Sequence, residues 1–206
     1  MKCLAANTAN SILSIALVDG DRLIYAYETA ETRDQGNLLL SHMQFGLKEE
    51  GLSFDDIDLL SVVTGPGSFT GIRIGLAAMR GIALASAKPI VGISSFELYA
   101  EARDGFQNIV CLESWRDELY IRLEDAEPVN LPPEEFSRSL PTGHYLISGD
   151  AADKLAPFVK GAAISERKST AADVALLGIA KFKAQGAQKP LPFYLRDADV
   201  TISTKS

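Results

Sequence analysis

The segment 65–76, Gly-Pro-Gly-Ser-Phe-Thr-Gly-Ile-Arg-Ile-Gly-Leu, contains residue types that can bind an anion or bring two backbones close together. Its glycines permit positive φ angles and close approach of another chain segment. Ser68 or Thr70 can cap the first N–H groups of the helix that is predicted to follow. A turn of this kind serves either as a cradle for an anion or as a tight contact surface.

The predicted helix over 69–87 carries small residues at three- and four-residue spacing, among them Gly71, Gly75 and Ala78. Each glycine inside a helix costs about 1 kcal/mol relative to alanine, so close packing must compensate for it. Two partners fit this face equally well, the protein's own sheet and the backbone of another protein. Arg73 and Arg80 lie on a different face, where they meet water or a partner.

Composition limits the classes of function. The chain has 206 residues, of which 47% are hydrophobic and 23% charged, which is typical of a globular protein. A formal charge of −7 disfavours a chain that binds nucleic acid unaided, because phosphate contacts need clustered Lys and Arg. Cys3 and Cys111 lie in apolar runs and are expected to be buried free thiols. No apolar run is long enough for a signal peptide or membrane span, so we expect a cytoplasmic protein without membrane contact.

The first half of the chain predicts three strands, then helix, strand, helix, strand, helix. This order is that of the ribonuclease H-like half-domain found in the actin, hexokinase and chaperone ATPase superfamily. A hairpin turn at Asp19-Gly20-Asp21 joins the second and third strands. The predicted strands are 3–6, 11–18, 22–27, 59–63 and 90–93, and the helices are 35–50, 69–87 and 94–103.

The second half predicts a reduced copy of the same unit. Strands are expected at 108–112, 118–123 and 145–148, with helices at 151–158 and 171–184. The range 128–141 is rich in turn residues and predicts a loop, and 190–206 predicts a tail that folds back with Tyr194 buried and Arg196 paired. The fold expected is therefore α/β, with two ribonuclease H-like half-domains at 1–104 and 105–206, the second reduced.

Three motifs resemble the TsaB family, formerly called YeaZ. They are the glycine-rich turn from Gly65 to Arg73, the opening Asn7-Thr8-Ala9 after a strand, and the closing Pro192-Phe193-Tyr194-Leu195-Arg196. The resemblance extends over nearly the whole chain and is strongest over 1–100. TsaB proteins serve the bacterial machinery that places threonylcarbamoyl on the adenosine next to the anticodon of tRNAs. The resemblance implies a non-catalytic subunit with no catalytic residues of its own.

The resemblance also implies partners. TsaB is a degenerate paralogue of the transferase TsaD and forms a heterodimer with it through the helices that correspond here to 35–50 and 69–87. The ATPase TsaE docks on that heterodimer, tRNA is met only through the complex, and ATP or ADP can lie near the junction with TsaD, with no firmly bound cofactor. The isolated chain is expected to form a homodimer. The expected interface residues are Leu39, His42, Met43, Gly67, Ser68, Phe69, Thr70, Gly71, Arg73, Ile74, Gly75 and Ala78.

Two other functions are weighed against this one. A small-molecule kinase or ATPase of the same superfamily would need an aspartate at the end of the first strand to handle magnesium, and Asn7 stands there instead. A glycoprotease-like metallopeptidase would need a histidine pair, whereas His42 and His144 lie far apart in the sequence and no metal site is expected. Should an anion bind at the glycine-rich turn, the residues expected to form the cradle are Asn7, Thr8, Gly65, Gly67 and Ser68.

Overall fold

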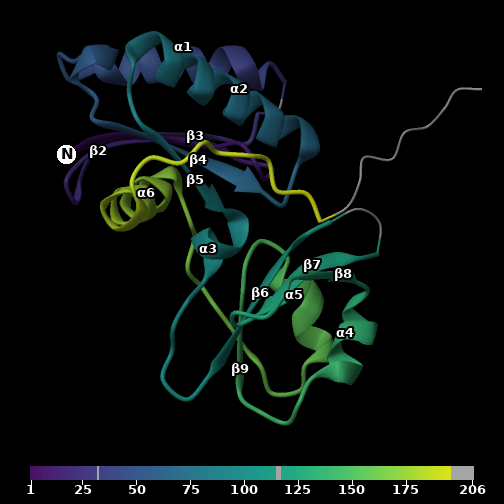
Figure 1. Cartoon of the computed structure of the whole chain (residues 1–206). Helices are drawn as coiled ribbons and strands as arrows, with labels where there is room; N and C mark the ends of the chain where they lie inside the picture. The colour runs from purple at the N-terminus through teal and green to yellow at the C-terminus, as the bar shows by residue number, and fades with distance from the viewer. Residues whose placement is uncertain (32, 115–116, 196–206) are drawn as a thin grey trace, which may run out of the picture.

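The chain folds into two α/β units, each built on a five-stranded sheet (Figure 1). The computed structural model describes residues 1–31, 33–114 and 117–195. Arg196, which was expected to be paired, therefore lies outside the described residues, as does Trp115.

The first sheet has the strand order β3-β2-β1-β4-β5. Strand β1 pairs antiparallel with β2 and parallel with β4, which is the ribonuclease H-like arrangement. Every residue of β4 is buried, as expected for a central strand that is covered on both faces. The strands are β1 (Lys2–Asn7), β2 (Leu13–Asp19), β3 (Arg22–Thr29), β4 (Leu59–Gly65) and β5 (Ile90–Ser94).

Helices cover both faces of the first sheet. Helices α1 (Gln35–Glu49) and α2 (Phe69–Ser86) lie together on one face, and α6 (Ala171–Gln185) lies on the other (Figure 1). Helix α6 comes from the second half of the sequence, yet it packs against β1, β2 and β4. The hydroxyl of Ser61 on β4 donates a 2.9 Å hydrogen bond to the carbonyl oxygen of Val174 on α6. A short 3₁₀ helix, η1 (Phe54–Asp56), precedes β4.

The second sheet repeats the strand order of the first. It runs β8-β7-β6-β9-β10, with β6 antiparallel to β7 and parallel to β9. The strands and helices of this second unit are on average shorter than those of the first. The expected pair of half-domains, with the second reduced, is confirmed. Its elements are β6 (Gln107–Glu113), β7 (Leu119–Leu123), β8 (Val129–Leu131), α4 (Pro133–Ser139), β9 (Tyr145–Ser148), α5 (Ala152–Leu155), η2 (Ala156–Phe158) and β10 (Ala163–Ile164).

The structure corrects three local predictions. The range 128–141, expected to be a loop, holds β8 and α4, because Pro133 occupies the first turn of a helix, where its missing N–H costs nothing. Helix α3 (Ser95–Tyr99) ends well before residue 103, and Ser94 is its cap. Tyr194, expected to be buried, is exposed.

The C-terminal segment closes against the first unit. The backbone N–H of Phe193 donates a 2.8 Å hydrogen bond to the carbonyl oxygen of Thr64, and the ring of Phe193 lies edge-on to that of Phe96. Cys3 and Cys111 are buried free thiols, as predicted, and burial raises the pKa of Cys3 to about 12. Among the described residues, no helix is both long enough and apolar enough to cross a membrane.

Candidate functional site

The glycine-rich turn connects the buried end of β4 to α2. Gly65 and Gly67 have φ angles of 103° and 153°, which a residue with a side chain rarely adopts. The Ser68 hydroxyl accepts a 3.2 Å hydrogen bond from the backbone N–H of Gly71. Ser68 is therefore the cap of α2, while Thr70 points toward solvent within the first turn.

A second turn, the one after β1, packs directly on this glycine-rich turn. The backbone N–H of Ser68 donates a 2.7 Å hydrogen bond to the carbonyl oxygen of Ala9. A Cβ atom on Gly67 would collide with that same oxygen, and a Cβ on Gly71 would collide with the carbonyl oxygen of Thr8. The glycines at 67 and 71 thus serve a close contact between two turns of the same chain.

The side chains expected to form an anion cradle are engaged in this contact. Asn7 and Thr8 are both buried. The side-chain oxygen Oδ1 of Asn7 accepts a 3.0 Å hydrogen bond from the backbone N–H of Ala9. The Thr8 hydroxyl donates a 2.7 Å hydrogen bond to the backbone carbonyl oxygen of Gly71. The Thr8 hydroxyl is thus used within the chain, and Asn7 uses its side-chain oxygen to cap its own turn.

Part of the expected partner interface is buried in this chain. Leu39 and Met43 of α1 are fully buried in the core, and Gly71 and Gly75 of α2 are also buried, whereas Ala78 is half-buried. A Cβ on Gly75 would collide with the Thr8 hydroxyl and would lie 3.5 Å from Val62 of β4. Packing within the same chain accounts for both glycines: Gly71 lies against the turn after β1, and Gly75 lies against that turn and β4.

The other members of the expected interface lie nearer the surface. Thr70, Arg73 and Ser68 are exposed, and the remaining five are half-buried. The Arg73 guanidinium carbon lies 3.6 Å from the centre of the Phe69 ring, and its Nε donates a 3.2 Å hydrogen bond to the Tyr194 hydroxyl. The C-terminal segment thereby meets the first turn of α2. The half-buried five are His42, Gly67, Phe69, Ile74 and Ala78.

An aromatic cluster on α1 and β3 forms a surface that the sequence reasoning missed. The ring of His42 stacks on that of Tyr27, with centroids 3.4 Å apart and planes 10° from parallel. The Tyr25 hydroxyl lies 3.4 Å from His42 Nδ1, and burial, together with Tyr27 and Glu49, raises the pKa of Tyr25. Phe45 packs beside Tyr25 and is 52% exposed. The sequence signal was the pair of tyrosines at alternate positions of β3, which places both side chains on one face of the strand.

The junction of the two units is lined by acidic groups. The Asp150 carboxylate accepts from the backbone N–H of Glu113 at 2.9 Å, and Lys154 pairs with the Glu113 carboxylate at 2.8 Å. Burial and the neighbouring Asp150 raise the pKa of Tyr99 to about 12. The side-chain amide of Asn10, in the turn after β1, donates a 3.0 Å hydrogen bond to the Tyr99 hydroxyl of the same unit.

The part of the chain that the structure describes contains no group of three or more His, Cys, Asp or Glu residues able to hold a metal ion. His42 lies in the aromatic cluster, and His144 lies edge-on to Phe106 in the second unit.

Known proteins similar to this chain have roles in tRNA modification. A family model described as "TsaD: tRNA N6-adenosine threonylcarbamoyltransferase" matches residues 31–126. The tRNA threonylcarbamoyladenosine biosynthesis protein TsaB of Escherichia coli (strain K12) is 36% identical over 101 residues, which is 49% of this chain and 43% of that relative. The chain thus spans less than half the length of this curated relative.

Two solved structures define the fold. YeaZ from Pseudomonas aeruginosa superposes with a TM-score of 0.74 at 23% identity, over 94% of this chain and 99% of the other. The ROK hexokinase from Thermus thermophilus superposes with a TM-score of 0.51 at 11% identity, over 89% of this chain and all of the other.

The chain is therefore an α/β protein of the actin and hexokinase-like fold, with two half-domains around a common junction. Within that class, the sequence relatives named TsaB and the match to the TsaD family model agree with the resemblance stated above: the chain is similar to TsaB proteins over about half of its length.

Proposed function

We propose that this chain is a non-catalytic subunit required for the transfer of threonylcarbamoyl to the adenosine next to the anticodon in tRNA. The observation that carries the proposal is the similarity to curated proteins named for tRNA threonylcarbamoyladenosine biosynthesis. The protein acts by forming a heterodimer with TsaD, and TsaE docks on that pair. It meets tRNA through the complex, in keeping with its net charge of −7.

The surface proposed for TsaD is the outer side of α1 with the neighbouring β3. The aromatic cluster of Tyr25, Tyr27, His42 and Phe45 is the feature that supports it, since aromatic residues supply much of the binding free energy at protein interfaces. Leu40 on the same helix is 41% exposed and adds apolar area. Residues 31–126 match a TsaD family model, and this similarity supports a pseudo-symmetric pairing through related helices.

The closed contact between the two turns supports a structural rather than a catalytic role. Asn7 and Thr8 stand where superfamily kinases hold magnesium and phosphate, and both side chains are bound to this chain's own backbone. A nucleotide in the complex would lie near the junction with TsaD, where the partner completes its site.

Reconstitution tests this proposal. Threonylcarbamoyl-tRNA synthesis is measured with the cognate TsaD, TsaE and adenylate-forming enzyme, with and without this chain. We expect product only when the chain is present, and no turnover by the chain alone. Equal product formation without the chain would refute the required role.

A further inference from the structure

A groove of about 430 Å³ lies where α3 and α6 of the first unit meet β7 of the second. Its volume is within the range of small-molecule sites, about 300–1,000 Å³. The wall includes apolar residues from β5 and α6. Its polar lining comes from both units, and the lining residues that matter here are Ile93, Leu177, Glu97, Arg122, Lys181 and Gln185.

Arg122 is the unusual member of this lining. Its Nε is the one buried side-chain nitrogen or oxygen of the described residues that has no hydrogen-bond partner. The guanidinium carbon lies 5.2 Å from the centre of the Phe96 ring, and Nη2 makes a single 3.4 Å contact with the carbonyl oxygen of Phe96. No ion pair within 4.0 Å joins Arg122 to a carboxylate of the described residues.

This arrangement is costly without a ligand. An unpaired buried donor costs about 1–3 kcal/mol, and more when the group is charged. Arginine is the residue best suited to hold a planar or tetrahedral oxyanion, through two parallel N–H···O bonds. Arg122 therefore has hydrogen-bond donors without a protein partner that an oxyanion could accept from.

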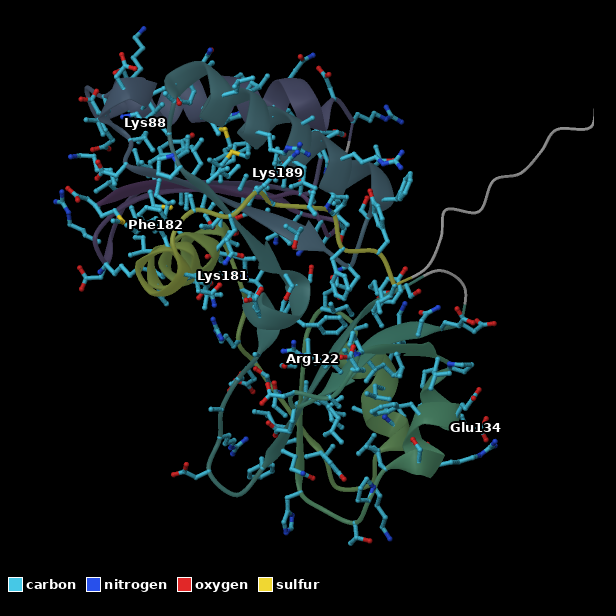
Figure 2. The ribbon with its side chains drawn as sticks, in the orientation of Figure 1. Lys88, Arg122, Glu134, Lys181, Phe182 and Lys189 are labelled. Atoms are coloured by element: carbon cyan, nitrogen blue, oxygen red, sulfur yellow. The ribbon has the colours of Figure 1, made fainter. Side chains whose placement is uncertain are left out.

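Lys181 supplies a second positive charge, on α6 of the other unit (Figure 2). Its Nζ lies 2.8 Å from the Glu97 carboxylate and 3.0 Å from the carbonyl oxygen of Gly92, so one of its three donors remains. Burial opposes ionisation of Glu97, but hydrogen bonds from Lys181 and Ser94 outweigh burial and lower its pKa. The charge of Lys181 thus balances that of Glu97. Arg122 then gives the groove lining a net positive charge, although the whole chain has a formal charge of −7.

We propose that this groove binds a small phosphorylated molecule, with its phosphate on Arg122 and the remaining donor of Lys181. The apolar side formed by Ile93 and Leu177 contacts the organic part of the ligand. Because Arg122 and Lys181 belong to different units, the bound ligand bridges them. This site is separate from the α1 surface proposed for TsaD.

Nuclear magnetic resonance of arginine Nε–H groups tests the site directly in the full chain. Comparison with Arg122→Lys identifies the Arg122 signal, and the protein is titrated with phenyl phosphate, inorganic phosphate and benzyl alcohol. We expect a saturable shift of the Arg122 signal with phenyl phosphate, a weaker response with inorganic phosphate, and none with the neutral alcohol. An Arg122 signal that is unmoved by either phosphate at millimolar concentration would overturn the proposal.

Isothermal titration calorimetry measures the affinity of the wild type and of two matched variants for phenyl phosphate. Arg122→Gln should weaken binding about tenfold or more, equivalent to about 1.4 kcal/mol. Arg138→Gln is the control, because Arg138 is exposed in the second unit and pairs with Glu134 far from the groove (Figure 2). Equal loss in both variants would show non-specific attraction and refute the site.

Lys181→Gln is a second variant that tests the site if Arg122→Gln does not fold. This variant leaves the Arg122 guanidinium in place and removes the second charge, so binding should weaken severalfold while far-ultraviolet circular dichroism is unchanged. Affinity that stays at the wild-type level in a folded Lys181→Gln protein would overturn the role of the groove.

Discussion

At the scale of single residues, the glycines of α2 differ in whether their surroundings leave room for a side chain. Gly71 and Gly75 face the turn after β1, where a Cβ would collide with Thr8. Gly81 is exposed on the same helix, and no atom lies within 4 Å of the position that its Cβ would take. The same residue type is therefore required at the first two positions and unfavourable at the third.

Alanine at positions 71 and 81 tests this difference. Gly71→Ala should lower the free energy of unfolding by about 1–3 kcal/mol, because the collision is with a backbone carbonyl that cannot rotate away. Gly81→Ala, the matched control, should raise it by about 0.5–1 kcal/mol, since alanine is the better helix former. Urea denaturation measures both. A Gly71→Ala protein as stable as Gly81→Ala would show that the two turns are not in close contact.

At the scale of elements, α6 is attached to the first sheet through its N-terminus. Thr170 and Asp173 form a capping box there, and Arg167 pairs with the Asp173 carboxylate at 2.9 Å. Burial opposes ionisation of Asp173, but hydrogen bonds from Thr170 and Arg167 outweigh it and lower the pKa below its usual value. The backbone N–H of Ala171 adds a 2.8 Å hydrogen bond to Ser14 of β2. The start of α6 thus joins the two halves of the sequence.

Asp173→Asn should therefore destabilise the protein in a pH-dependent manner. The loss at neutral pH should be about 1–2 kcal/mol, as for a hydrogen-bonded charged cap. Because the folded-state pKa is lowered, the advantage of Asp173 is present above the pKa of the unfolded chain and disappears as pH falls through the folded-state value. Thermal unfolding between neutral and acidic pH measures it, with exposed Asp104→Asn as the control. A constant difference between wild type and Asp173→Asn at all pH values would contradict this account.

At the scale of the whole molecule, an apolar cluster joins the two similar sheets. Phe96 of α3 is buried against Val110 and Leu112 of β6, and Phe193 of the C-terminal segment packs on that cluster. The outer side of α1 lies away from this junction (Figure 1). Binding of a partner on α1 therefore leaves the contact between the units unobstructed.

Phe45→Glu tests the proposed association surface. The ring is 52% exposed, so the variant should keep the wild-type unfolding midpoint. Binding to TsaD, and self-association of the isolated chain, should weaken about tenfold or more, because a charge replaces an aromatic contact. Phe158→Glu in the second unit, where the ring is 45% exposed, is the matched control. Sedimentation velocity measures both. Unchanged association of Phe45→Glu would place the interface elsewhere.

Local sequence patterns were enough to predict the order of strands and helices in the first half of the chain and the repeat of the ribonuclease H-like unit. Hydrophobic periodicity and turn residues act over short ranges, and they predicted the bounds of α1, α2 and β9 to within about two residues, as is usual for such boundaries. They failed at 128–141, where Pro133 fits both a loop and the first turn of a helix.

Which way the glycine face of α2 points was decided by tertiary structure alone. A face of small residues suits the protein's own sheet and a partner equally, and the packing of Thr8 against Gly71 settled the choice. That Arg122 and Lys181 line one groove also depends on how the two units meet. Patterns of nearby residues determine local structure, but contacts between distant segments exist only once the chain has folded.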